Sequence, residues 1–397
     1  MFFYNKAINI IKILGIKFKH TIDNPLRYEK ICSKAGIKTL LFVRTDGIGD
    51  FIFDLPYIKY IKASKKYKDY KIILMGNSNN VQLGKKYASL YIDDYIKINH
   101  ADGCKRIQKD IKNISFTTII NPIDSKLNTI TELAIKDIKA KEKICHKGFF
   151  CADELKTQEQ ETTDIINNYT KVIDTGEKIM FVGDRCHLFF ELLLEENIPY
   201  AEKLKDIAIN PDINSDFIVV SPFSRSEDRI YSPENFAKII DFITVNFNIP
   251  VLIIGDEREH EQAEYIKYLC CKQNMIYNMA GKLTIQESIL YIRMSKLLVA
   301  NETGTVHIAQ NHNVRTVCIS NGSYMGTFQP YSGNESYVTY VYPDNIFEYI
   351  KENNLEGNLI KYDINKISPD KVNLVISDIL TKEKREPCLT PKDKAIA

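Results

Sequence analysis

The sequence predicts an α/β protein built from two doubly wound domains, and three observations lead to that fold class. The chain has 397 residues, which is more than one ordinary hydrophobic core accommodates. Short β-rich runs alternate with longer helical patterns, as in parallel sheets that carry helices on both faces. This alternation occurs twice, so we expect Rossmann-like domains at residues 38–210 and 211–380 that face each other across a cleft.

The first domain is expected to begin with a buried strand, a glycine-containing turn and a helical run toward Lys66. Its predicted strands are Thr39–Val43, Ile72–Met75 and Phe116–Ile120. The charged and mixed residues 151–210 should close this domain and carry the link to the second. There the predicted strands are Phe217–Val220, Val251–Ile254, Leu297–Ala300 and Val317–Ile319. A helix should begin near Pro233, with Ser232 as its N-cap.

Two terminal segments are expected to lie outside these domains. Residues 1–37 predict a basic amphipathic N-terminal extension, because the positions from Phe3 to Phe18 form an apolar face on a helix. Such a helix either lies on an anionic membrane surface or packs on the body of the protein, and periodicity alone does not decide. Residues 381–397, rich in Lys and Pro, are expected to be disordered.

Composition narrows the class of protein. Hydrophobic residues make up 44% and charged residues 26%, which is typical of a globular chain. The net charge of +2 argues against a protein that binds nucleic acid over its whole surface. Nine cysteines without paired metal-ligand spacing predict reduced, mostly buried thiols in a cytoplasmic protein. We find no apolar run long enough to span a bilayer.

Three turns contain residues that could take part in catalysis or ligand binding. The first follows the first predicted strand and runs from Arg44 to Asp50. Gly47 and Gly49 allow a sharp turn and a close approach to a ligand. Asp50 should lie at a helix start facing the cleft, either as a general base or simply as a helix cap. The third glycine of a dinucleotide fingerprint is missing here. Asp54, one turn later, is expected to face the surface, and the alternative is a second carboxylate that helps to orient Asp50.

The second turn is Ala300–His307, again between a strand and a helix. The free N–H groups and the dipole of a helix start favour an anion such as phosphate. Thr303 and Thr305 add hydroxyl donors, and His307 lies within the first helical turn. A lone histidine is more often structural, but the strand–turn–helix context favours a phosphate site.

The third turn runs from Ser221 to Arg225 and on to Arg229, before the helix that begins near Pro233. Arginine suits a diphosphate because its planar fork donates two parallel hydrogen bonds. The alternative for Arg225 and Arg229 is solvated surface charge. Asp93–Asp94 does not form a metal-binding D-x-D motif and is expected to be surface charge.

The order of these turns resembles glycosyltransferase family 9, which contains the ADP-heptose:lipopolysaccharide heptosyltransferases. The resemblance extends from about Lys38 to about Tyr331 and rests on five elements in the right order. They are Leu41–Pro56, Arg229–Phe236, Gly255–Glu257, Ala280–Gly281 and Asn301–His307.

The resemblance implies a GT-B architecture and an inverting, metal-independent transfer of a sugar, with heptose from ADP-heptose as the implied donor. The acceptor would be a lipid-linked, lipopolysaccharide-type glycan at the inner face of the cytoplasmic membrane. Asp50 matches the general base, beside the acceptor-side glycines Gly47 and Gly49. The positions matching the donor site are Ser224, Arg229, Glu257, Glu302, Thr303, Gly304 and His307.

Three positions depart from the family pattern, which leaves the nucleotide and the sugar open. Arg229 replaces a common Lys, Glu302 replaces Asp, and Tyr231 replaces Trp. No cofactor is expected beyond the nucleotide-sugar substrate, and no metal and no nucleic acid. A non-catalytic nucleotide- or glycan-binding protein of the same fold is one alternative. A nucleotide-dependent oxidoreductase is another, although Asn77–Asn80 supplies no acidic residue after the second strand.

Overall fold

The computed structural model describes residues 36–98, 114–124, 132, 135–148, 165–176, 179–204, 217–331, 336–353, 355, 360 and 362–382. The amphipathic N-terminal extension and the C-terminal tail fall almost entirely outside these residues and stay predictions. The domain limits at residues 210/211 also lie in a stretch outside them.

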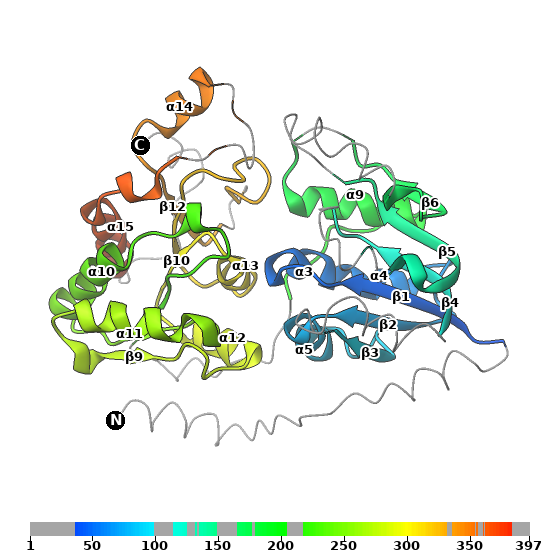
Figure 1. Cartoon of the computed structure of the whole chain (residues 1–397), viewed down its shortest axis with the longest axis horizontal. Coiled ribbons are helices and arrows are strands. Elements are labelled where there is room, and N and C mark those ends of the chain that lie inside the picture. The colour runs from blue at the N-terminus through cyan, green and yellow to red at the C-terminus, as the bar shows by residue number, and fades with distance from the viewer. Residues whose placement is uncertain are drawn as a thin grey trace.

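Within the described residues, two parallel six-stranded sheets form the two halves of the molecule (Figure 1). The first sheet has the order β3-β2-β1-β4-β5-β6 and the second β12-β11-β10-β7-β8-β9. In both, the chain moves outward to one edge and then returns to build the other side, so the doubly wound prediction is confirmed. The strand order reverses between β1 and β4 and between β7 and β10, where ligands bind in such sheets.

The strands of the first sheet are β1 (Lys38–Arg44), β2 (Tyr70–Gly76), β3 (Asp94–Lys97), β4 (Ser115–Asn121), β5 (Lys139–His146) and β6 (Lys171–Ile173). Those of the second are β7 (Ile218–Ser221), β8 (Val251–Ile253), β9 (Ile276–Asn278), β10 (Leu298–Asn301), β11 (Thr316–Ile319) and β12 (Val338–Val341). The strands predicted from sequence correspond to β1, β2, β4, β7, β8, β10 and β11. The other five were not predicted.

The helices of the first half are α3 (Ile48–Asp54), η1 (Leu55–Tyr57), α4 (Ile58–Ala63), α5 (Ser78–Tyr87) and α9 (Val182–Leu194). The predicted helical run toward Lys66 is therefore interrupted. Pro56 stands at the start of the 3-10 turn η1. Because proline has no N–H and hinders the preceding residue's helical conformation, it breaks a helix at such a point.

The helices of the second half are α10 (Pro233–Asn246), α11 (His260–Leu269), α12 (Ile285–Met294), α13 (Gly304–Asn311), α14 (Ile346–Glu352) and α15 (Pro369–Thr381), with short 3-10 turns η3 (Glu227–Arg229), η4 (Glu257–Glu259), η5 (Gln273–Met275) and η6 (Ile364–Lys366). Helix α10 begins as predicted. The side chain of Ser232 accepts a hydrogen bond from the Asn235 N–H at 3.2 Å, and Pro233 occupies the first turn.

One hydrophobic cluster extends across both halves of the molecule. It includes Phe51 and Leu55 of the first half together with Val306 and Ile308 of α13. Figure 1 shows α3 beside α13 where the two halves meet. Among the described cysteines, only Cys271 is exposed. None of the described helices combines the length and apolarity that a membrane span requires.

Candidate functional site

The starts of helices α3 and α13 touch each other between the two halves of the molecule. A Cβ atom on Gly49 would lie 2.8 Å from His307 Cδ2 and 3.5 Å from Gly304 Cα. A Cβ on Gly304 would lie 3.2 Å from the Gly49 nitrogen. Side chains at these positions would push the halves apart. The close backbone approach expected at Gly49 is therefore made to the second half of the molecule.

Asp50 lies in the first turn of α3 and is partly buried. Its carboxylate folds back over the preceding turn, because a Cβ on Gly47 would lie 2.6 Å from Asp50 Oδ2. Burial raises the pKa of Asp50, Arg44 opposes this increase, and Asp124 adds to it. A carboxylate with a raised pKa accepts a proton more readily near neutral pH, which suits a general base.

Arg44 ends strand β1 beneath this turn and is buried. Its guanidinium lies 3.1 Å from Asp46 Oδ2 and 3.2 Å from Asp54 Oδ2. The prediction that Asp54 faces the surface is thus wrong: only 1% of this residue is exposed. A buried guanidinium needs an anionic partner, and Asp54 supplies it from the inner face of α3. Burial raises the pKa of Asp54 to about 6, while Arg44 lowers it.

The start of α13 offers donors without partners. Thr303 is the N-cap, and its side chain makes no capping hydrogen bond. The hydroxyl of Thr305 is buried and has no hydrogen-bond partner among the described residues. Free helix N–H groups and an unsatisfied hydroxyl at a positive dipole end form a suitable site for an anion.

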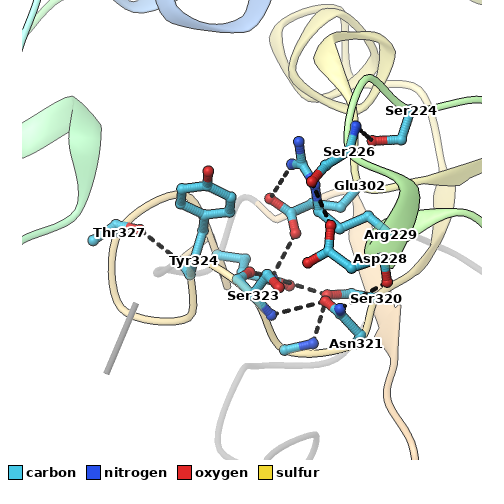
Figure 2. A network of polar contacts seen from close by, with 12 residues as sticks. Ser224, Ser226, Asp228, Arg229, Glu302, Ser320, Asn321, Ser323, Tyr324 and Thr327 are labelled. Atoms are coloured by element: carbon cyan, nitrogen blue, oxygen red, sulfur yellow. Dashed lines mark hydrogen bonds and ion pairs between the residues drawn. The ribbon is translucent and has the colours of Figure 1, made fainter. Parts of the chain in front are cut away.

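Arg229 and Glu302 meet beside this helix start (Figure 2). Arg229 Nη1 lies 3.6 Å from Glu302 Oε1, with the guanidinium 5.1 Å from the centre of the Tyr324 ring. Burial raises the pKa of Glu302 to about 8, although Arg229 lowers it. A protonated Glu302 would leave the charge of Arg229 available for an anion. The alternative of solvated surface charge is therefore wrong for the partly buried Arg229, whereas Arg225 is exposed.

Two further donor-site candidates, Ser224 and Glu257, lie at the same carboxyl edge of the second sheet. Ser224, after β7, accepts a hydrogen bond from the Ser226 N–H at 3.4 Å (Figure 2). Glu257, after β8, is exposed and packs against Gly281, where a Cβ would lie 2.8 Å from Glu257 Cα. Neither side chain makes a described contact with Arg229 or Glu302.

His307 is buried within the first turn of α13. Its Nδ1 lies 2.6 Å from the hydroxyl oxygen of Tyr331. Burial lowers the pKa of His307 to about 4, and Arg229 lowers it further. The imidazole is therefore neutral near pH 7.

The segment from Ser320 to Tyr331 completes the site and was not found by sequence reasoning. Gln329 Nε2 donates to Glu302 Oε2 at 3.0 Å and to Ser320 Oγ at 2.9 Å. The available signal was a pair of glycines after β11: Gly322 and Gly326 have positive φ angles of 85° and 84°. Positive φ angles have a low conformational energy only for glycine, so two such glycines indicate a loop with a specific backbone conformation.

No group of three His, Cys, Asp or Glu side chains suited to a metal ion occurs within the described part of the chain. Asp93 and Asp94 are not the surface charges expected. Asp93 accepts a hydrogen bond from the Ile72 N–H at 2.9 Å and one from Lys71 at 2.7 Å, and Asp94 is buried. Both carboxylates contribute to the edge of the first sheet.

Part of the sequence matches a known protein family. The family model described as glycosyltransferase family 9 (heptosyltransferase) matches residues 157–350. That range contains every donor-site candidate and excludes the turn that holds Asp50. No curated protein matches the sequence.

Several solved structures share the fold at low sequence identity. A glycosyl transferase family 9 protein from Veillonella parvula is 14% identical, with a TM-score of 0.62 over 87% of this chain and 98% of its own. E. coli ADP-heptose lps heptosyltransferase II is 13% identical, with a TM-score of 0.62 over 88% and 100%. E. coli heptosyltransferase WaaC with ADP is 13% identical, with a TM-score of 0.60 over 86% and 99%. These structures have the two-domain GT-B arrangement.

Proposed function

We propose that this chain, of which residues 157–350 match glycosyltransferase family 9, catalyses the inverting transfer of a heptose from ADP-heptose to a hydroxyl of a lipopolysaccharide-type glycan. The glycosyltransferase class follows from the family. The donor, the acceptor, the inversion and the independence of metal are proposals. The observation that supports them most is the contact between the α3 and α13 starts, which brings the turn that holds Asp50 against the proposed anion site.

In the proposed reaction the acceptor hydroxyl gives its proton to Asp50 as its oxygen attacks the anomeric carbon. The bond from that carbon to the diphosphate breaks, and the diphosphate leaves with the electron pair. Asp50 is the single base proposed, so one displacement inverts the anomeric configuration. Glycosyl transfer requires both removal of the acceptor proton and stabilisation of the leaving group.

The departing diphosphate is assigned to the second half of the molecule. The N–H groups at the start of α13, Thr303 and Arg229 would share its charge, and the neutral His307 would add a hydrogen bond. Two structures with this fold support the choice of nucleotide, because their descriptions name ADP-heptose and ADP. Ser224 and Glu257 are proposed to bind other parts of the donor.

The proposal is tested by incubating the full chain with ADP-heptose and a panel of other nucleotide sugars, with and without a lipopolysaccharide glycan that lacks heptose. We expect ADP release that depends on the acceptor, and a product of inverted anomeric configuration by NMR. Retained configuration would contradict a single displacement at Asp50. Tight ADP binding without turnover of any donor would favour the non-catalytic alternative.

We further propose that the chain docks reversibly on the inner face of the cytoplasmic membrane. From Met1 to Lys38 the sequence has eight Lys or Arg and two Asp or Glu, a net of 8 − 2 = +6. Each basic residue near an anionic surface contributes roughly 1 kcal/mol, and salt screens that attraction. Deleting residues 1–20 should reduce sedimentation with anionic vesicles. Equal sedimentation of the deleted and full chains would refute the proposal.

A further inference from the structure

His307 lies in a cluster of aromatic rings that come from both halves of the molecule. Its ring centre is 5.2 Å from that of Phe53, 5.8 Å from that of Phe328 and 5.8 Å from that of Tyr331. Phe53 belongs to α3, one turn after Asp50. Phe181, just before α9, packs edge-on against Tyr331 at 5.3 Å. These contacts restrict rotation of the imidazole, so each ring nitrogen keeps a fixed direction.

One edge of the imidazole faces Tyr331. The 2.6 Å separation between Nδ1 and the tyrosine oxygen is that of a strong hydrogen bond. Its direction follows from the available partners. Burial raises the pKa of Tyr331 well above its usual range, so the hydroxyl keeps its proton. Among the described residues its proton has one acceptor, His307 Nδ1. The direction that gives this proton an acceptor is donation by the hydroxyl to the lone pair of Nδ1.

The other edge of the imidazole faces the contact between the two helix starts. A Cβ on Gly49 would lie 3.5 Å from His307 Nε2. A neutral imidazole carries one proton. If Nδ1 accepts, that proton is on Nε2, at the side where the turn of Asp50 meets the start of α13.

We propose that Tyr331 is a positioning residue that holds His307 as the Nε2–H tautomer, so that a neutral N–H donor points to the junction of the two turns. The inference deepens the proposed function and rests on it, because the junction is where the diphosphate would lie. The opposite tautomer would turn a lone pair toward that anion and repel it. A protonated imidazole would place a second positive charge near that of Arg229 in a buried site, where the two charges repel each other.

The first experiment reads the tautomer directly and needs no turnover. In the full chain with ¹⁵N-labelled histidine, long-range ¹H–¹⁵N spectra near pH 7 distinguish Nδ1–H, Nε2–H and the imidazolium. His307 is one of seven histidines, and its signals are those lost in His307→Gln. We expect Nε2–H in the full chain and a mixture of tautomers in Tyr331→Phe. Observing Nδ1–H or the imidazolium in the full chain would overturn the proposal, as would an unchanged tautomer in Tyr331→Phe.

A matched control removes another tyrosine hydroxyl from the same region. Tyr342 donates to Gln329 Oε1 at 3.1 Å and makes no described contact with His307. Tyr342→Phe should leave the His307 tautomer unchanged. If it shifts the tautomer as much as Tyr331→Phe does, the effect is a general loosening of the loop and the assignment to Tyr331 fails.

A double-mutant cycle tests whether Tyr331 acts through His307. Tyr331→Phe should lower kcat about threefold to tenfold, the scale of one neutral hydrogen bond, with little change in KM. His307→Gln places an amide N–H close to the Nε2 position and needs no partner at Nδ1. Adding Tyr331→Phe to His307→Gln should therefore have little further effect, and a full second loss would contradict the proposal. No turnover of any nucleotide sugar, together with the expected tautomer, would count against the proposed function alone.

Discussion

Helices α3 and α13 start in the same way but differ in the charged groups around their starts. Each follows a buried strand at the point where its sheet reverses order, and each has a glycine at the contact with the other. Beneath the start of α3 lies a buried cation, Arg44, with the carboxylates of Asp46 and Asp54 against it. Beside the start of α13 lies a buried carboxyl, Glu302, with the guanidinium of Arg229 against it.

The difference shows how one backbone arrangement supports two tasks. The dipole of a helix start favours an anion at both places. In α3 the chain supplies that anion itself, as Asp50, and burial raises its pKa toward the range of a useful base. In α13 we propose that a ligand supplies the anion: Thr305 has no hydrogen-bond partner among the described residues, and the raised pKa of Glu302 favours its protonated form. The first start is thus suited to accept a proton and the second to hold a diphosphate.

Removing the proposed base should have the largest effect. Asp50→Asn keeps the shape of the side chain and removes its basicity, so kcat should fall about 10²–10⁴-fold. Binding of ADP should change little, because its phosphates are assigned to the other half. Steady-state kinetics and calorimetry on the folded variant test both statements. Turnover near the normal rate would remove Asp50 from the mechanism.

Removing the buried cation beneath α3 should mainly reduce stability. Arg44→Met leaves Asp54 buried without its partner, which typically costs about 3–5 kcal/mol in the free energy of unfolding. The pKa of Asp54 is about 6 in the folded chain. Because this pKa is higher than the value of about 4 in the unfolded chain, Asp54 by itself contributes to stability fully below about pH 4. That contribution is lost as the pH rises through about 6. The variant's loss should therefore be larger at pH 8 than at pH 5.

Denaturant unfolding at both pH values measures this effect, and a second variant serves as its control. Arg44→Met combined with Asp54→Leu removes both partners and should recover much of the lost stability. If the single variant unfolds like the unaltered chain at pH 8, the ion pair has no structural importance.

The contact between the two helix starts predicts a graded steric effect. The Cβ of Gly49→Ala would approach His307 Cδ2 to 2.8 Å, whereas that of Gly304→Ala would approach the Gly49 nitrogen to 3.2 Å. Overpacking of this kind costs about 1–3 kcal/mol. Gly49→Ala should therefore reduce kcat/KM more than Gly304→Ala. The reverse order would mean that the halves do not approach each other in this way during turnover.

Chelation of metal ions should have the smallest effect. Because a helix start and Arg229 are proposed to stabilise the diphosphate, activity in excess EDTA should equal activity without it. Loss of activity that Mg²⁺ or Mn²⁺ restores would contradict the division of roles between the two helix starts.

The fold was predictable where burial is continuous along the sequence. Strands β1 and β2 contain the apolar runs Leu40–Val43 and Ile72–Met75. The ends of these runs also locate the turns that follow them. Strand β5 escaped prediction because its first half is charged and largely in contact with solvent. Strands β6 and β9 have three residues each, too few to establish a period, and they lack the continuous apolar run from which β8, of the same length, was predicted.

The candidate site was predictable only as far as local sequence determines it. Glycines, a helix cap and a histidine in a first turn are signals within a few residues. The burial of Asp54 depends on Arg44 at the end of another element, and the orientation of His307 depends on Tyr331 in the loop after β11. The contact of Gly49 with Gly304 depends on how the two halves pack. Single-residue patterns carry no information on such pairs.

Calorimetric binding of ADP, compared with adenosine, tests the division of roles most directly. Arg229→Ala should weaken ADP binding by about 1.5–3 kcal/mol, the scale of a hydrogen bond to a charged group, and should leave adenosine binding nearly unchanged. Asp50→Asn should bind both ligands as the unaltered chain does. Equal losses for ADP and adenosine in Arg229→Ala, or a loss of ADP binding in Asp50→Asn as large as that in Arg229→Ala, would contradict the account.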